Sequence, residues 1–275
     1  MTGLLGAVEI REIAARLDLK PTKKLGQNFV VDANTCRRIV KAADVLPTDT
    51  ALEIGPGLGS LTLAILEAAH DCVVVEIDSR LASELPATAV RHGFDISKLT
   101  VINEDAMGLT PLAQNPTVLV ANLPYNVSVP VLLRAFEVLP SLRAGVVMVQ
   151  SEVADRLVAK PGSKNYGSPS VKATWWADLV SAGNVARSIF WPVPNVDSSL
   201  VRFDRHPAAG DEDLRIKTFA LIDAAFGQRR KMLRSALSGV LGSEASAIIE
   251  SAGIDPTIRG EALVLADYIR IAQKL

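Results

Sequence analysis

Short apolar runs alternate with amphipathic stretches between Thr50 and Val149. Val, Ile and Leu dominate the runs, which is typical of strands that are buried on both faces of a parallel sheet. The stretches between them have helical spacing, so the pattern predicts an α/β fold with helices on both faces, joined by right-handed crossovers. The expected strands are 51–54, 72–77, 99–103, 118–121 and 145–149, and the expected helices are 58–69, 79–90 and 129–139.

The pattern changes towards the C-terminus. Two more apolar segments, 177–185 and 198–203, are expected to add antiparallel strands at the edge of the sheet. After His206-Pro207-Ala208-Ala209-Gly210 the spacing is helical throughout, with breaks at glycines and a proline. We therefore predict two domains, one over residues 1–206 that contains the sheet and a small all-helical one over residues 211–275.

Composition excludes several classes of protein. Of the 275 residues, 49% are hydrophobic and 21% charged, which is enough for a buried core and argues against disorder. No stretch is long and apolar enough to span a bilayer, and charged residues interrupt the N-terminal segment where a secretory signal would lie. Two cysteines are too few for a disulfide framework, and three scattered histidines lack metal-ligand spacing. We expect a cytoplasmic protein without a metal.

The formal net charge of −1 is unusual for an enzyme that acts on nucleic acid, because phosphate binding usually leaves a basic footprint. Such a footprint can be local. Lys20, Lys23 and Lys24 form one basic cluster, and residues 229–234 contain another. For either cluster taken alone, a solvated surface is the more common explanation.

A glycine-rich turn follows the first expected strand, in Glu53-Ile54-Gly55-Pro56-Gly57-Leu58-Gly59. Glycines let the backbone pass close to a ligand, and ligands of such sheets bind beyond the carboxyl ends of the strands. The next strand ends at Glu76, whose carboxylate can accept hydrogen bonds from both hydroxyls of a ribose. The spacing G-x-G-x-G favours a mononucleoside ligand over NAD only weakly. Asp105, after the third strand, suits either an adenine amino group or a helix N-cap.

The fourth expected strand runs into Asn122-Leu123-Pro124-Tyr125, where the chemistry becomes more specific. An exocyclic adenine amine is a poor nucleophile, because its lone pair is delocalised into the ring. The Asn122 side-chain carbonyl and a backbone carbonyl next to Pro124 can both accept from that amine and orient it for attack. Pro124 fixes the backbone, and Tyr125 offers an aromatic face to an extruded base. A plain strand-to-helix turn would also use Asn and Pro.

At these residues the chain resembles the ribosomal RNA adenine dimethyltransferase superfamily, and within it the bacterial small-subunit branch, over nearly its whole length. The branch's basic motif matches Phe226-Gly227-Gln228-Arg229-Arg230-Lys231, and the large-subunit antibiotic-resistance enzymes generally lack this double arginine. Val129 departs from the family pattern, which usually has a small hydroxyl residue there, and the isoelectric point of about 6.3 is low for the family. The other matching segments are 24–29, 122–125, 190–198 and 259–263.

The resemblance implies a Rossmann-like class I methyltransferase with a C-terminal helical domain and S-adenosylmethionine as cofactor. It assigns Asn28, the backbone at Val30 and Asn122 to cofactor contacts. Gly55 is assigned to its methionine side, Glu76 to the ribose and Asp105 to the adenine. Phe190 is matched to a second aromatic that sandwiches the target base with Tyr125, although a core aromatic would also explain it. The residues implied to bind RNA are Lys23, Lys24, Arg229, Arg230 and Lys231.

The implied activity is the transfer of two methyl groups to each of two adjacent adenines near the 3′ end of small-subunit ribosomal RNA. We expect a monomer that acts on a partly assembled subunit. A large-subunit enzyme, an assembly or transcription factor that has kept the fold, and a DNA adenine methyltransferase are alternatives. The double arginine disfavours the first, the complete motif set the second, and the small C-terminal region the third.

Overall fold

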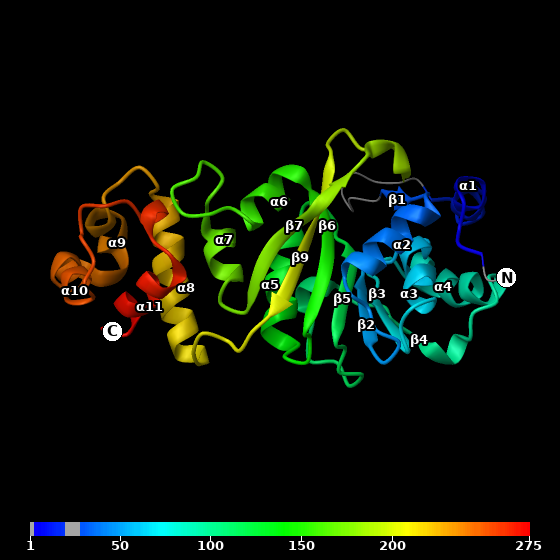
Figure 1. Cartoon of the computed structure of the whole chain (residues 1–275), viewed down its shortest axis with the longest axis horizontal. Coiled ribbons are helices and arrows are strands. Elements are labelled where there is room, and N and C mark those ends of the chain that lie inside the picture. Colours follow the sequence, from blue (N-terminus) through cyan, green and yellow to red (C-terminus); the bar gives the residue numbers. More distant parts are fainter. Residues whose placement is uncertain (1–2, 20–27) are drawn as a thin grey trace. The chain divides into compact units, whose positions relative to one another are not determined.

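The computed structural model describes residues 3–19 and 28–275, and these form two compact units (Figure 1). The first unit comprises the described residues up to Ala154 together with Val180–Arg205. The second comprises Asp155–Leu179 and His206–Leu275. Each unit is therefore assembled from two separate stretches of the chain.

A seven-stranded sheet forms the centre of the first unit. Its strands are β2 (Thr50–Ile54), β3 (Asp71–Val75), β4 (Leu99–Ile102), β5 (Val118–Asn122), β6 (Ala144–Gln150), β7 (Ala177–Val185) and β9 (Ser198–Arg205). They lie in the order β4-β3-β2-β5-β6-β9-β7 (Figure 1). The first five pair in parallel, and β9 runs antiparallel to β6 with Leu200 opposite Met148. The order along the chain reverses at β2, which places a ligand crevice at the carboxyl ends of β2 and β5.

The predicted α/β class and central strands are confirmed, with strand ends that differ from the expected ones by one or two residues. Leu52, Val74 and Val120 are fully buried, as continuous apolar runs require in a sheet that is covered on both faces. The helix predicted over residues 58–69 is shorter, at α3 (Ser60–Leu66). Its first expected residues belong to the glycine turn, because Gly59 takes a left-handed conformation with φ 98° and caps the helix.

Helices flank this sheet. The others that begin in the first unit are α1 (Ala7–Arg16), α2 (Ala33–Ala42), α4 (Ser79–Arg91), α5 (Ser128–Val138) and α6 (Ser151–Leu157). An aspartate caps the N-terminus of α2 and of α4: Asp32 accepts from the Thr35 N–H, and Asp78 accepts from the Arg80 N–H. Within the described part of the chain, no helix is both long enough and apolar enough to cross a bilayer.

A second, two-stranded sheet was not predicted. It pairs β1 (Phe29–Val30) with β8 (Phe190–Trp191) in antiparallel orientation. The Phe29 and Trp191 rings stack with centroids 6.2 Å apart, and the Val31 N–H donates to the Ile189 carbonyl at 2.8 Å. This sheet ties a segment close to the N-terminus to one that precedes β9.

The second unit is helical. Its helices are α7 (Ser168–Ala173), α8 (Glu212–Gly227), α9 (Leu233–Leu241), α10 (Ala245–Ser251) and α11 (Leu265–Ala272). Residues 155–179, which lie within the range 1–206 assigned to the methyltransferase domain, pack here through aromatic side chains. Trp175 and Trp176 meet Phe219 of α8 edge-on, at 5.9 and 5.5 Å between ring centroids. The Tyr166 hydroxyl donates to the Leu263 carbonyl at 2.8 Å.

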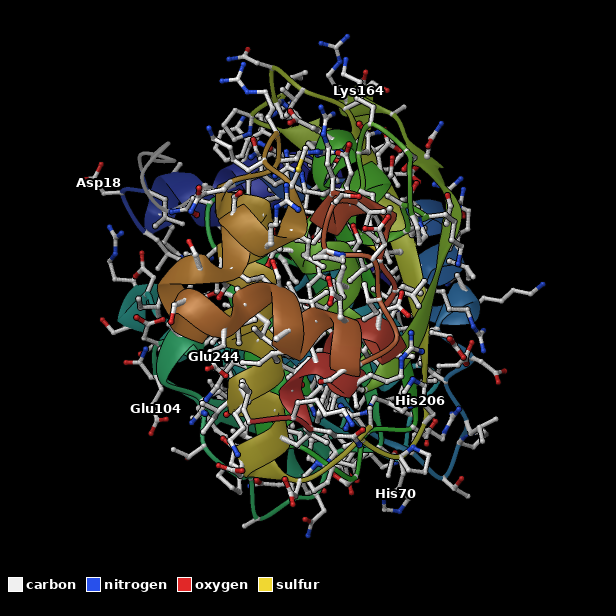
Figure 2. All side chains as sticks on the ribbon, turned by 90° about the vertical axis from the view of Figure 1, so that its left-hand side faces the viewer. Asp18, His70, Glu104, Lys164, His206 and Glu244 are labelled. Carbon is white, nitrogen blue, oxygen red and sulfur yellow. The ribbon has the colours of Figure 1, made fainter. Side chains whose placement is uncertain are left out.

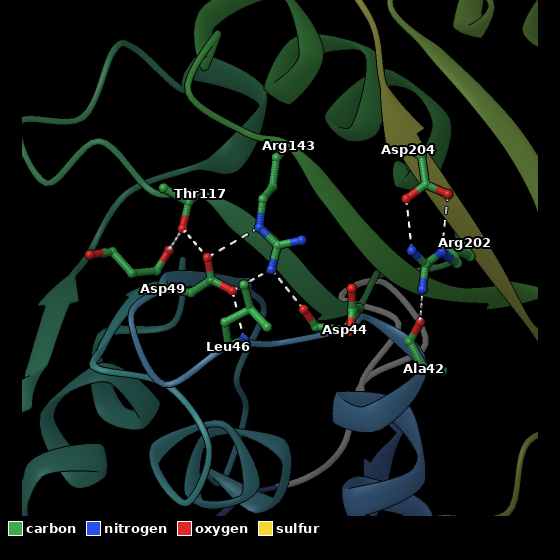
Figure 3. A network of polar contacts seen from close by, with 9 residues as sticks. Ala42, Asp44, Leu46, Asp49, Thr117, Arg143, Arg202 and Asp204 are labelled. Carbon is green, nitrogen blue, oxygen red and sulfur yellow. Dashed lines mark hydrogen bonds and ion pairs between the residues drawn. The ribbon is translucent and has the colours of Figure 1, made fainter.

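Polar contacts join the amino ends of three parallel strands (Figure 3). Asp49, Thr117 and Arg143 immediately precede β2, β5 and β6. The buried Asp49 carboxylate accepts from the Thr117 hydroxyl at 2.8 Å, from the Leu46 N–H at 2.7 Å and from the Arg143 guanidinium. Paired charges and hydrogen bonds therefore link the strands at this end of the sheet.

Candidate active site

A cavity of about 210 Å³ lies at the opposite end, where β2, β3 and β5 finish. Two of its lining segments are the glycine turn after β2 and the segment around β1. The structure thus brings together most of the predicted cofactor and catalytic residues, while Leu123, Tyr125 and Phe190 do not line this cavity. The predicted residues that line it are Asn28, Val30, Gly55, Glu76, Asp105, Asn122 and Pro124.

The glycine turn is shaped by a close approach. Gly57 has a φ of 58°, and a Cβ there would stand only 2.9 Å from ring atoms of Phe29. Gly55 likewise has a φ of 72°, in the left-handed region that side chains disfavour. These positions need glycine because the backbone must both turn sharply and pass under an aromatic ring at the cavity wall.

Glu76 is held ready to accept hydrogen bonds. Its side chain is buried at the end of β3, and its two oxygens each accept one backbone N–H, from Gly57 at 3.1 Å and from Asp78 at 2.9 Å. Burial raises the pKa of Glu76, although both hydrogen bonds oppose this. Each carboxylate oxygen has capacity for a further donor, which fits the two hydroxyls of a ribose.

Asp105 caps a short turn and also lies at the cavity wall. Its Oδ1 accepts from the Met107 N–H at 2.9 Å, so it caps the short 3₁₀ turn Ala106–Gly108. The residue also lines the cavity, where its second oxygen is available to an adenine amino group. The neighbouring Glu104 is exposed at the surface and also lines the cavity (Figure 2).

Asn28 reaches the site through its backbone. The Asn122 side chain donates from Nδ2 to the Asn28 carbonyl at 3.1 Å, which links the start of β1 to the end of β5. Val30, in β1, is buried and also lines the cavity. The predicted RNA-contacting residues Lys23 and Lys24 lie outside the described residues.

The tetrapeptide 122–125, which begins at the last residue of β5, is held by its backbone. The Leu123 N–H donates to the Met148 carbonyl at 3.0 Å, and the Pro124 carbonyl accepts from the Val127 N–H at 3.2 Å. The Tyr125 hydroxyl lies 2.8 Å from Ser198 Oγ, and burial raises the pKa of this phenol. The tyrosine ring is therefore anchored at its polar end.

Phe190 lies in the hydrophobic core of the first unit with 2% of its surface exposed. In this conformation a base cannot stack on the ring, because neighbouring side chains cover it. The placement agrees with a core role for this aromatic, and its predicted contact with the target base would require the surrounding residues to move.

Sequence reasoning gave no function to Glu53, which precedes the glycine turn and also lines the cavity. This carboxyl is 1% exposed and accepts from the Thr62 hydroxyl at 2.6 Å. Burial, together with the charge of Glu76, raises the pKa of Glu53 to about 8. The sequence did contain a signal for this residue, because Glu53 lies within an apolar strand. Acids are almost never fully buried without a partner, so an acid at such a position suggests a functional role.

In the second unit, the predicted RNA-binding residues differ in their surroundings. Arg229 forms an ion pair with Glu261 and donates to the Ser163 carbonyl at 3.2 Å. Arg230 and Lys231 follow it along the chain, and both are exposed. Arg229 thus fixes the end of α8 to the loop that contains Ser163, while its two neighbours remain accessible to solvent.

Two solved structures resemble the chain in fold. A dimethyladenosine transferase from Plasmodium falciparum superposes with a TM-score of 0.75 at 24% identity, covering 88% of this chain and 95% of that one. The 23S rRNA methyltransferase ErmE superposes with a TM-score of 0.66 at 23% identity, covering 90% of this chain and 99% of that one. These likenesses show the class I methyltransferase fold.

Relatives in sequence are much more similar. A protein of Leifsonia xyli named ribosomal RNA small subunit methyltransferase A is 56% identical, over 98% of both chains. A protein of the same name from Kineococcus radiotolerans is 57% identical, over 99% of this chain and 92% of its own length. A family model described as ribosomal RNA adenine dimethylase matches residues 19–275. The chain therefore belongs to the ribosomal RNA adenine dimethylase family.

Proposed function

We propose that this chain dimethylates two adjacent adenines near the 3′ end of small-subunit ribosomal RNA. Membership of the family makes it an rRNA adenine dimethyltransferase that uses S-adenosylmethionine. The choice of the small subunit is supported by relatives above 50% identity that are named for small-subunit RNA. The observation that carries the proposal is the gathering of Glu76, Asp105 and Asn122 around one cavity.

The residues present fit the cofactor. Each carboxylate oxygen of Glu76 already accepts one hydrogen bond and can accept another from a ribose hydroxyl. One oxygen of Asp105 can accept from an adenine amine. The glycine turn leaves its backbone within reach of a methionine moiety. No described Lys or Arg pairs with Glu53 or Glu76. S-adenosylmethionine supplies a methyl group on a sulfonium cation, and such a cation suits a cavity that is lined by acids without their own counter-charge.

The polar groups after β5 orient the acceptor amine. The Asn122 Oδ1 and the carbonyl of Leu123 accept one N–H each, which directs the nitrogen lone pair at the methyl group. We assign the backbone acceptor to Leu123 because the neighbouring Pro124 carbonyl already closes a turn with Val127. The methylated amine is acidic enough to lose its proton to water, so no side chain needs to act as a base. Tyr125 stacks on the target base.

We further propose that the second unit docks the enzyme on the ribosomal particle. Arg229 holds the loop 160–164 beside the end of α8, so Lys160 and Lys164 belong to the same basic surface as Arg230 and Lys231. Lys164 projects outward from its loop (Figure 2). These side chains suit phosphate contacts on folded RNA, without reading bases. We infer a monomer in the cytoplasm whose substrate is a partly assembled small subunit.

Labelled S-adenosylmethionine tests the choice of substrate. The enzyme is incubated with small-subunit particles, with protein-free small-subunit RNA and with large-subunit RNA, and incorporation is measured in each. Label should enter the particles most efficiently. Preferential labelling of large-subunit RNA would favour the large-subunit class, and absence of label in every RNA would favour a binding function for the fold.

A variant tests the docking surface. Changing Arg230 and Lys231 to alanine should weaken particle binding and flatten its salt dependence, because the log–log slope falls by about 0.7–0.9 for each phosphate that is no longer neutralised. Lys274→Ala, at an exposed lysine outside this cluster, is the control. Affinity for S-adenosylmethionine should stay unchanged. A double variant that binds particles as tightly as the wild type, with the same salt slope, would remove the docking function from this surface.

A further inference from the structure

The orientation of the Asn122 amide is decided by one neighbour. A backbone carbonyl accepts hydrogen bonds and never donates, so the amide atom that lies 3.1 Å from the Asn28 carbonyl must be Nδ2. Oδ1 then points away from Asn28. Among the described residues no donor bonds to Oδ1, and Asn122 lines the cavity. The acceptor half of the amide is therefore the half that is free for a ligand.

The Asn28 carbonyl is itself held in place by the two-stranded sheet of β1 (Phe29–Val30) and β8 (Phe190–Trp191), which we call the clasp. Backbone pairing sets Val30 opposite Phe190, and Phe29 stacks on Trp191 with the ring planes 24° apart. Phe29 also packs against Gly57, so close that a Cβ would collide with the ring. Asn28 precedes Phe29 directly, and its carbonyl cannot shift without disturbing these contacts.

We propose that the clasp is a positioning element that fixes which half of the Asn122 amide faces the target base. The proposal rests on the acceptor role given to Asn122 above. It adds that this role depends on Trp191 and Phe29, neither of which needs to touch the base. Trp191 acts through Phe29 and the Asn28 carbonyl, and it does not itself line the cavity.

The arrangement has a consequence for base selection. Adenine presents an amine donor at the position where guanine and hypoxanthine present a carbonyl acceptor. With Oδ1 facing the base, Asn122 accepts a hydrogen bond from the amine of adenine and repels the carbonyl oxygen of guanine or hypoxanthine. If the amide rotated, Nδ2 would instead attract the carbonyl of a wrong base. The clasp thus supports both amine activation and the preference for adenine.

Variants at Trp191 separate positioning from binding. Trp191→Leu removes the stack on Phe29 without changing a cavity-lining residue, and Trp191→Phe keeps an aromatic ring as the matched control. At saturating substrate concentrations, Trp191→Leu should lower kcat about tenfold, on the scale of a misplaced reacting group, while Trp191→Phe stays close to wild type. Inhibition by RNA with inosine at the target positions should strengthen in the leucine variant. If this variant does not fold, Trp191→Met gives the same comparison.

A double-mutant cycle shows whether the effect passes through Asn122. In an Asn122→Ala background there is no amide left to orient, so adding Trp191→Leu should not lower single-turnover activity further. The same tenfold reduction in both backgrounds would mean that the clasp acts on something else, and the proposal would be wrong.

A readout without RNA makes the outcome independent of the proposed function. The side-chain amide signal of Asn122 is observed by NMR in protein carrying isotope-labelled asparagine, and is assigned by its disappearance in Asn122→Ala. In the wild type its protons should exchange slowly with solvent, and in Trp191→Leu they should exchange faster. An unchanged signal in a folded Trp191→Leu variant would overturn the proposal. Failure of the proposed function would instead appear as a wild-type enzyme that leaves adenine unmethylated, whatever the amide signal shows.

Discussion

The buried acids at the two ends of the parallel sheet have pKa values that are shifted in opposite directions. At the amino end, burial opposes ionisation of Asp49, but hydrogen bonds from Arg143, Leu46 and Thr117 outweigh it and lower the pKa of Asp49 (Figure 3). At the carboxyl end, burial dominates and raises the pKa of both Glu53 and Glu76, because no described cation pairs with either.

This difference separates stability from function within one sheet. A matched network such as that around Asp49 has no unmet bonding capacity and serves only to hold strands together. The acids at the cavity keep unused acceptor capacity, which costs stability in the empty protein and becomes favourable when a ligand supplies donors and positive charge. Changes at the two ends should therefore be measured by different experiments.

The largest expected effect is on turnover at the carboxyl end. Asn122→Ala should lower kcat by ~10²-fold or more, since it removes a hydrogen-bond partner that matters most in the transition state. Calorimetric affinity for S-adenosylmethionine should change much less, and thermal unfolding should stay close to that of the wild type. Near wild-type turnover would show that the amine is activated in another way.

At the amino end the effect should appear in stability alone. Asp49→Ala removes the acceptor for three groups and should lower the free energy of unfolding by about 2 kcal/mol, a value reduced by the partial exposure of Arg143. Denaturant unfolding measures this. The kcat of the folded variant at low temperature should equal that of the wild type, and a lower kcat would contradict the separation of the two ends.

Glu76→Ala should act on cofactor binding. Removal of charge-assisted hydrogen bonds to a ribose should weaken S-adenosylmethionine binding by roughly 1.5–3 kcal/mol, measured by calorimetry. Glu244→Ala, at an exposed acid outside the cavity lining, is the control (Figure 2). Unchanged affinity in a folded Glu76→Ala protein would remove this residue from the ribose site.

The pH dependence of stability should also differ between the two ends of the sheet. The pKa of Glu53 is about 8 in the folded protein against an ordinary value of 4.5, so folding takes up a proton between these values and stability falls as pH rises through that window. Glu53→Gln should therefore gain stability over the wild type as pH rises from about 5 to 8.

Asp49→Asn should behave in the opposite way. The lowered pKa of Asp49 stabilises the fold above about pH 4, and this contribution disappears on acidification, so the deficit of Asp49→Asn should shrink as pH falls. Melting temperatures at a series of pH values measure both variants. Parallel pH profiles for Glu53→Gln and Asp49→Asn would refute the contrast between the two ends.

Much of this site could be predicted because its chemistry lies next to regular strands. Glu76 and Asn122 lie at the ends of apolar runs that are typical of buried strands, and parallel strands bring their carboxyl ends together. Asp105 could be placed at the same edge, but its capping of Ala106–Gly108 was one of two open possibilities until the structure showed it.

The remaining features depend on contacts distant in sequence. β1 and β8 are each two residues long, too short for any alternation of apolar and polar positions, and their pairing spans about 160 residues of chain. Residues 155–179 carry no pattern that predicts their packing on α8, which depends on Trp175 and Trp176 meeting Phe219. A buried Phe190 and a base-stacking Phe190 look alike in the sequence.

Product mapping tests whether the chain dimethylates two adjacent adenines of small-subunit RNA. Small-subunit particles that lack the modification are incubated with the enzyme and S-adenosylmethionine, and the 3′-terminal fragment of their RNA is sequenced by mass spectrometry. We predict two adjacent adenosines, each carrying two methyl groups on the exocyclic nitrogen, and neither with Asn122→Ala. Methylation of another base, of a ring nitrogen, or only of large-subunit RNA would show that the proposed activity is wrong.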